Sequence, residues 1–275
     1  MKPPSNGSAV LWKTIGVASL AATLLLIFGF AYAVYDITNP SAANQDEAEQ
    51  QAPDKQPSLS DQDEIRITAI GDSLTKGTGD NTGQGYVRQV IDGLSEKLDK
   101  PVKLINNLAL NGLRADELAD KLESDNGMQF ALRQANVILL TIGGNDLFQF
   151  AQGTGAGQTA EEIRVEHLSG GLEEGAERLA KVFKLLNEIN PEARIVYVGL
   201  YNPFYDMEDL REGSLQVQDW NREAYKMSMD YPNISVIPTF DLFEHSIGSY
   251  LSSDHFHPNH AGYGQIAARI VQILE

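Results

Sequence analysis

The chain has 275 residues, a formal net charge of -17 at pH 7 and no cysteine. The absence of cysteine excludes a disulfide framework, a thiolate metal site, a cysteine nucleophile and a lipid-modified cysteine anchor. The acidic balance argues against nucleic acid or an anionic membrane surface as the main partner of the soluble part, since both would repel it.

Residues 14–35 carry no charged side chain. As a helix this stretch would reach roughly 33 Å, enough to cross the hydrocarbon core of a membrane. Lys2 and Lys13 precede it and Asp36 follows it. The positive-inside bias therefore predicts that residues 1–35 form a cytoplasmic start and a membrane anchor, with the rest of the chain outside the cytoplasm.

A secretory signal peptide is the alternative to an anchor. Ala31-Tyr32-Ala33 has the small residues of a cleavage site. The apolar run is longer than an ordinary signal core, so we favour the anchor, but both interpretations export the rest of the chain. Residues 36–64 are polar and acidic and predict a disordered linker, so the folded domain is expected over residues 65–275.

Strand-like and helix-like runs alternate along this domain. The predicted strands are Ile65–Ile70, Val102–Asn106, Val137–Ile142, Arg194–Leu200 and Ile234–Pro238. The predicted helices are Tyr86–Leu98, Ala115–Ser124, Gly170–Ile189, Leu215–Asp230 and Ala261–Leu274. Short apolar strands separated by helices indicate an α/β fold with a parallel sheet of about five strands, covered on both faces.

Two segments after predicted strands are too irregular for simple crossovers. One spans residues 148–169 and contains three closely spaced glycines, and the other spans residues 201–214. Both are expected at the carboxyl edge of the sheet, where loops carry binding residues. The sequence leaves open whether either acts as a lid or is an ordinary surface loop.

Ser73 stands on the turn between the first predicted strand and the first long helix, in Gly71-Asp72-Ser73-Leu74. That turn lies at the carboxyl edge of the sheet, where open α/β folds place their ligands. A serine hydroxyl needs a base, a group that orients the base, and donors for a developing oxyanion. Asp72 is expected to be structural, holding the turn.

A base for Ser73 must be one of five histidines. Three of them lie in the segment 254–260, just before the last helix, and Asp254 stands three residues before His257. One turn can therefore aim the carboxylate of Asp254 at Nδ1 of His257 and leave Nε2 facing Ser73.

Two further segments offer hydrogen-bond donors. Gly143-Gly144-Asn145-Asp146 ends a buried strand, and the amide of Asn145 could face an oxyanion. Residues 107–112 follow the second strand and end in Gly112, whose N–H could be a second donor. Ordinary turn chemistry explains each of these segments equally well when it is considered alone.

Taken together, four segments resemble the sequence blocks of the SGNH (GDSL-type) esterases and lipases. They are Gly71–Leu74, Asn107–Gly112, Gly143–Asp146 and Asp254–Asn259, in the order of the family. The resemblance covers about residues 65–275. One departure lies in the second block, where Asn111 occupies the place of a serine found in many members.

The resemblance implies a flavodoxin-like, three-layer α/β/α fold and a serine esterase. It implies Ser73 as nucleophile, His257 as base and Asp254 as the residue that orients it. It also implies an oxyanion hole made by the backbone N–H groups of Ser73 and Gly112 and by the side chain of Asn145. No cofactor or metal is implied.

Two alternatives remain. A metal-dependent phosphoesterase could use the Asp and His cluster, with Asp72, Asn145, Asp146, Asp254, His255, His257 and His260 as ligands. A flavin-binding module could also occupy such a fold. We favour an exported esterase or lipase that cleaves a small-molecule, lipid or acylated glycan ester or thioester and contacts the membrane through residues 14–35. The sequence does not indicate the acyl length or the oligomeric state.

Overall fold

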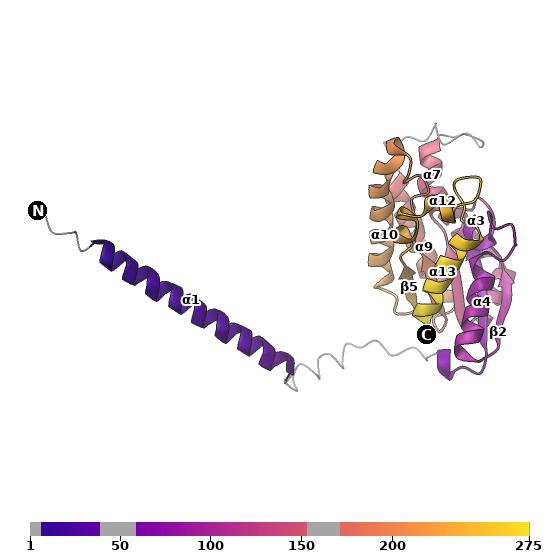
Figure 1. The fold of residues 1–275 in the computed structure, drawn as a ribbon. Helices are drawn as coiled ribbons and strands as arrows, with labels where there is room; N and C mark the ends of the chain where they lie inside the picture. Colours follow the sequence, from indigo (N-terminus) through magenta and orange to yellow (C-terminus); the bar gives the residue numbers. More distant parts are fainter. Residues whose placement is uncertain (1–6, 39–58, 153–170, 275) are drawn as a thin grey trace, which may run out of the picture. The chain divides into compact units, whose positions relative to one another are not determined.

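The computed structural model describes residues 7–38, 59–152 and 171–274 (Figure 1). The chain divides into two units, residues 1–55 and 56–275. The first contains helix α1 (Gly7–Thr38). Within the described ranges, Val10–Tyr35 of this helix is the one segment long and apolar enough to cross a membrane. Most of the predicted linker, residues 39–58, lies outside the described residues.

The second unit is built on a parallel sheet of five strands. They are β1 (Ile65–Gly71), β2 (Val102–Asn107), β3 (Val137–Thr141), β4 (Arg194–Val198) and β5 (Ile234–Ile237). Their order is β2-β1-β3-β4-β5, which is the flavodoxin-like arrangement. The predicted fold class is confirmed, and each predicted strand is present with slightly different ends.

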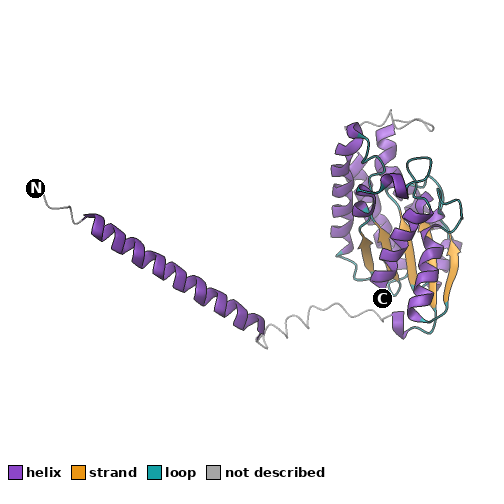
Figure 2. Ribbon diagram, viewed as in Figure 1, coloured by secondary structure: helices purple, strands orange, loops and turns teal. Residues whose placement is uncertain are grey.

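Helices cover both faces of the sheet (Figures 1 and 2). One face carries α4 (Gly85–Leu98) and α13 (His260–Leu274), which pack against each other. The other face carries α5 (Ala115–Ser124), α6 (Asn126–Gln134), α9 (Leu172–Ile189) and α10 (Ser214–Ser228). The long helices expected from the sequence are all present; Gly170, the predicted start of one, lies outside the described residues.

The side chains of β3 alternate between the two faces of the sheet, which explains why helices must pack on both faces. Ile138 and Leu140 lie in the core cluster under α5, α9 and α10, while Val137 and Leu139 lie in the cluster under α4 and α13. All four are fully buried. Each such side chain contributes about 1.5–3 kcal/mol of hydrophobic stabilisation, so neither helical layer can be removed without exposing the sheet.

Several short elements were not predicted. They are α3 (Ser73–Lys76), α6, α7 (Gly144–Gln152), α11 (Phe240–Glu244), α12 (Ile247–Tyr250) and the 3-10 turns Leu59–Asp61 and Glu208–Gly213. The irregular segment expected at residues 148–169 therefore begins inside α7. Its remainder from residue 153, with its glycines, lies outside the described residues.

The segment 201–214 packs against the domain. Tyr201 and Phe204 are buried, and the Tyr201 hydroxyl donates to the Phe256 carbonyl over 2.7 Å. This hydrogen bond holds segment 201–214 against the turn that contains His257.

The centre of the sheet is a topological switch point. β1 and β3 are neighbours, with Gly71 opposite Thr141, but the chain leaves β1 toward β2 and leaves β3 toward β4. The connections diverge and leave a crevice at the carboxyl ends of these two strands. Ser73 follows β1 and Asn145 follows β3, so both stand at this crevice.

Candidate active site

Ser73, His257 and Asp254 form a continuous hydrogen-bonded chain. Ser73 Oγ lies 2.8 Å from His257 Nε2, and His257 Nδ1 lies 2.7 Å from Asp254 Oδ2. The three side chains come from opposite ends of the domain sequence and meet at the crevice. This is the arrangement in which an imidazole can accept a proton from a serine hydroxyl while a carboxylate holds its other nitrogen.

A tight turn fixes the carboxylate of Asp254. Its Oδ1 accepts hydrogen bonds from the backbone N–H groups of Phe256 and His257 and from the Ser252 hydroxyl. Partial burial pushes the pKa of Asp254 upward, but these bonds and the bond to the His257 ring lower the pKa to about 2. Asp254 is therefore ionised at neutral pH and faces Nδ1 of His257.

Gly79 lets the loop after α3 pass close to His257. Its φ is +94°, and a Cβ at this position would lie 2.7 Å from the His257 Cβ and 2.6 Å from the Pro258 carbonyl oxygen. Any larger residue would have to displace this backbone. No local pattern in the sequence predicts this contact.

Asp72 holds the turn that presents Ser73. It is the N-cap of α3, where its side chain accepts from the Leu74 N–H, and it also accepts from the Thr141 hydroxyl over 2.6 Å. Thr141 in turn contacts the Thr75 hydroxyl at 2.7 Å, and Thr75 contacts the Tyr86 hydroxyl at 2.7 Å. Because Thr141 donates to Asp72, Thr75 must donate to Thr141 and Tyr86 must donate to Thr75. Each hydroxyl in this series of hydrogen bonds therefore points toward the Asp72 carboxylate.

Burial is the largest influence on Asp72 and raises the pKa of its carboxyl, opposed by the bonds from Thr141 and Leu74. The expected structural role of Asp72 agrees with these contacts, which tie the end of β1 to the end of β3.

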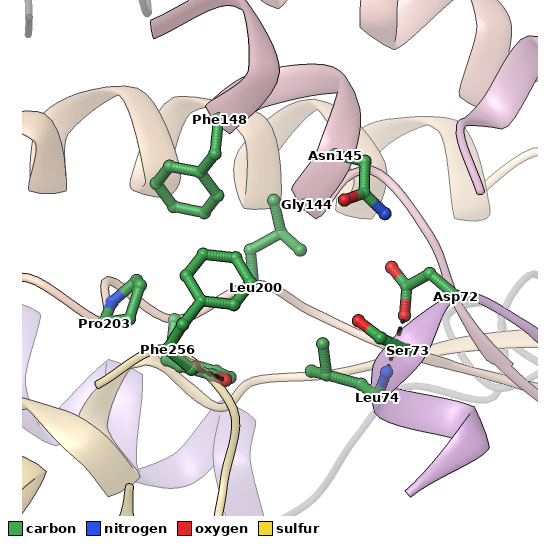
Figure 3. Close-up of a pocket in the computed structure, with 10 residues that line it drawn as sticks. Asp72, Ser73, Leu74, Gly144, Asn145, Phe148, Leu200, Pro203 and Phe256 are labelled. Carbon is green, nitrogen blue, oxygen red and sulfur yellow. Dashed lines mark hydrogen bonds between the residues drawn. The ribbon is translucent and has the colours of Figure 1, made fainter. Parts of the chain in front are cut away.

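Asn145 stands at the start of α7 and lines the same pocket as Ser73. Its Nδ2 donates one hydrogen bond to the Leu113 carbonyl over 2.9 Å. The amide carries a second N–H, and the bond to Leu113 fixes the plane in which that N–H points. Figure 3 shows the Asn145 nitrogen turned toward the side of the pocket that holds Asp72 and Ser73.

Gly112 lies on the loop after β2 in a left-handed conformation, with φ of +76°. The Leu110 N–H donates to the Gly71 carbonyl over 2.9 Å, which holds this loop beside the end of β1. Gly112 is not among the residues that line the pocket. Its place as an oxyanion donor stays a prediction.

The two glycines before Asn145 differ in their surroundings. A Cβ on Gly143 would lie 2.1 Å from the ring of Trp220 in α10, so the first glycine serves core packing. Gly144 lines the pocket. Of the two, only the second fits the expectation that a glycine lets the backbone approach a substrate.

The remaining histidines of the 254–260 segment point to different partners. His255 Nε2 lies 3.1 Å from Asp206 Oδ1, and His260 Nδ1 lies 3.2 Å from Asp80 Oδ2. In the part of the chain that the structure describes, no group of three or more His, Asp or Glu side chains is arranged to hold a metal ion. The cluster that a metal-dependent phosphoesterase would need is thus divided into separate pairs.

Asp146 links the Asn145 helix to the start of α5. Its Oδ2 accepts from the Ala115 N–H over 2.9 Å, and its Oδ1 lies 3.5 Å from Nη1 of Arg178. Burial is the largest influence on this carboxyl and raises its pKa to about 6, against the opposing effects of Ala115 and Arg178. Two consecutive residues, Asn145 and Asp146, therefore both bind the segment 113–115.

This raised pKa predicts a pH effect on stability. Between about pH 4 and pH 6 the folded state holds a proton on Asp146 that the unfolded state releases, so the free energy of unfolding falls as pH rises, by up to about 3 kcal/mol. Asp146→Asn keeps an acceptor for Ala115 and removes this titration. Urea unfolding at pH 4.5 and 7 should show the variant gaining stability relative to wild type at pH 7. An equal change in stability at both pH values, or the same gain in the control Asp120→Asn at an exposed position of α5, would contradict the assignment.

A pocket beside Ser73 holds about 320 Å³ of space, part of it open to solvent. Figure 3 shows Asp72, Ser73 and Asn145 on one side and the rings of Phe148 and Phe256 on the other. The remaining lining residues are Leu74, Gly144, Leu200, Tyr201 and Pro203. The aromatic residues were not predicted as site residues, although Phe256 lies between Asp254 and His257 and Phe148 lies one turn after Asn145.

Comparisons with known proteins identify the family of this chain. The model of the GDSL-like Lipase/Acylhydrolase family matches residues 69–265. The uncharacterized protein YpmR of Bacillus subtilis is 36% identical over 216 residues, which cover 77% of this chain and 82% of YpmR. The spore germination lipase LipC of Bacillus licheniformis is 28% identical over 207 residues, or 75% of this chain and 94% of LipC.

A solved lipase structure also matches most of this chain. The lipase Lip_vut3 from a goat rumen metagenome superposes with a TM-score of 0.65 at 26% identity, covering 77% of this chain and all of that lipase. These matches favour ester hydrolysis over the flavin-binding and metal-dependent alternatives.

Proposed function

This chain belongs to the GDSL-like lipase/acylhydrolase family and is a carboxylic ester hydrolase, and we propose that it works through Ser73, His257 and Asp254. The observation that carries the proposal is the pair of contacts at His257, 2.8 Å from Nε2 to Ser73 Oγ and 2.7 Å from Nδ1 to Asp254 Oδ2. They leave the imidazole one nitrogen for the nucleophile and one for the carboxylate.

In the acylation step, Ser73 Oγ attacks the carbonyl carbon of the ester and its proton passes to His257 Nε2. The tetrahedral intermediate then collapses, the bond to the alcohol oxygen breaks, and Nε2 protonates the departing alcohol. In the second step, water attacks the acyl-serine, gives a proton to Nε2 and releases the carboxylic acid as Ser73 regains its proton. Asp254, with a pKa of about 2, stabilises the imidazolium in both steps.

The oxyanion is proposed to receive hydrogen bonds from the N–H groups of Ser73 and Gly112 and from Asn145 Nδ2. Ser73 is the first residue of α3, and the first N–H groups of a helix have no acceptor within it. Asn145 offers the N–H that its bond to Leu113 leaves over. Donors fixed in advance stabilise the developing charge without reorganising.

Metal removal tests this proposal against the phosphoesterase alternative. The purified full chain should hydrolyse p-nitrophenyl acetate at the same rate before and after dialysis against EDTA, because none of the steps uses a metal. Loss of hydrolysis with EDTA and recovery with zinc or manganese would support the metal-dependent alternative instead.

For location, we propose that α1 anchors the protein and that residues 36–275 lie outside the cytoplasm. Val10–Tyr35 has the required length and composition, and the lysines on its amino side set the orientation. In cells stripped of their wall, external protease should digest the hydrolase domain, and carbonate washing should leave the protein in the membrane fraction. A soluble product that begins near Val34 would instead establish a cleaved signal peptide.

A further inference from the structure

Three phenylalanines from separate segments pack together at the pocket: Phe148 and Phe256 line it, and Phe204 packs against both. Phe148 and Phe256 lie edge to face with ring centroids 5.7 Å apart, and Phe204 lies 5.9 Å from the first and 6.0 Å from the second. Phe148 belongs to α7, Phe204 to the segment after β4, and Phe256 to the turn that carries His257. We call this group the aromatic wall.

The aromatic wall is held in place by its surroundings. Phe148 and Phe204 are only 5% and 6% exposed. The Phe256 carbonyl accepts from the Tyr201 hydroxyl, and the Tyr201 ring stacks on Phe243 at a centroid distance of 4.0 Å. Closely packed rings of this kind do not move aside without a loss of contacts, so the wall sets a fixed limit to the pocket.

The pocket is small. The space of about 320 Å³ between its lining atoms includes open solvent, so the enclosed part is smaller than that. The reacting ester group uses some of this enclosed space, which leaves room for a short acyl chain only.

Resting on the proposed function, we propose that this pocket receives the acyl group and that the aromatic wall restricts the substrates to short-chain esters. Phe148 and Phe256 are the residues that set the limit. The wall lies across the pocket from Ser73 (Figure 3), so each added carbon up to the wall is buried, and the next one collides with it.

The pocket fits the acyl group better than the alcohol group. Its lining beyond Ser73 and Asn145 is apolar, with Leu74, Leu200 and the aromatic rings. The alcohol must leave with a proton from His257 Nε2, and His257 is not among the residues that line the pocket. A polar alcohol is therefore placed toward solvent, and the apolar chain is placed inside.

Rates on two series of esters test the assignment, with the full chain and water-soluble substrates. For p-nitrophenyl esters from two to eight carbons, kcat/KM should rise about fourfold per methylene, the factor expected for burial of one CH2, until the acyl chain reaches the aromatic wall. It should then fall at least tenfold by eight carbons. A series of acetates with longer alcohols should show no such fall.

Substitution at the wall should move the limit. Phe148→Ala, and independently Phe148→Leu, should raise the ratio of kcat/KM for the octanoate to that for the acetate by at least tenfold. The ratio is the readout because it is unaffected by a general loss of active enzyme. Phe256→Ala should act in the same direction. Phe130→Ala, on an exposed position of α6 with 64% exposure, should leave the ratio unchanged.

The outcomes separate the two proposals. A wild-type rate that rises steadily to eight carbons, a limit that appears in the alcohol series instead, or an unchanged ratio in both Phe148 variants would overturn the short-acyl assignment while leaving the serine mechanism in place. A wild-type protein that cleaves no ester of either series would overturn the proposed function itself.

Discussion

Replacing Ser73 by alanine is expected to lower kcat for p-nitrophenyl acetate by about 10⁴-fold or more, and replacing His257 by alanine should do the same. In the proposed mechanism the two residues act as one unit, because the hydroxyl is a weak nucleophile until the imidazole 2.8 Å away accepts its proton. The double variant should therefore be no slower than either single variant. The measurement is kcat for the three variants under saturating substrate.

Ser253→Ala is the matched control, since Ser253 is exposed and stands next to Asp254. It should retain wild-type kcat. A Ser73→Ala enzyme within tenfold of wild type, or losses that multiply in the double variant, would contradict a shared role for Ser73 and His257.

The second large effect is expected at Asn145. If its free N–H stabilises the oxyanion, Asn145→Ala should lower kcat by about 10² to 10³, near 3 to 4 kcal/mol, with KM little changed. Asn145→Asp should lower kcat at least as far, because it places a carboxylate where a donor is needed and where negative charge develops.

The bond from Asn145 to the Leu113 carbonyl gives a structural role that must be separated from catalysis. Thermal melts of both variants provide that separation, because loss of this bond lowers Tm whether or not the second N–H acts on the substrate. An Asn145→Asp enzyme near wild-type kcat would rule out the oxyanion role. Loss of kcat in both variants, measured at a temperature at which their melts show that they are folded, would support it.

The fold was predictable because its signals are local. The central strands β1 and β3 are largely apolar runs, and burial on both faces gives them the near-continuous apolar pattern of a parallel sheet. Their alternation with helices then determines which loops lie at the carboxyl edge. On this basis the sequence predicts that Ser73, Asn145 and Asp254-x-x-His257 lie at one edge of the sheet.

Helices without enough length or periodicity were not predictable in this way. The four residues of α3 give too short a pattern. α6 begins at Asn126-Gly127, a pair typical of turns, although Asp125 caps it by accepting from the N–H groups of Gly127 and Met128. Tertiary packing overrides the local preference there, and the buried Met128 and Leu132 provide it.

The parts of the site missed from the sequence depend on contacts between distant segments. Phe148, Phe204 and Phe256 are separated in sequence, and no local pattern pairs them. The raised pKa of Asp146 was not predictable for the same reason, because it follows from burial against α5 and α9 and not from its neighbours in the chain. The sequence names the proposed reacting groups, whereas the walls of the pocket are defined only by the fold.

Covalent labelling of the active serine is the most direct measurement of the central claim that Ser73 is the nucleophile activated by His257. A fluorophosphonate should form one adduct, found by mass spectrometry on the peptide that contains Ser73. Labelling should be unaffected by EDTA, should fall at least a hundredfold in His257→Ala, and should abolish ester hydrolysis in proportion. An adduct on another residue, or hydrolysis that persists at full rate after complete labelling of Ser73, would contradict it.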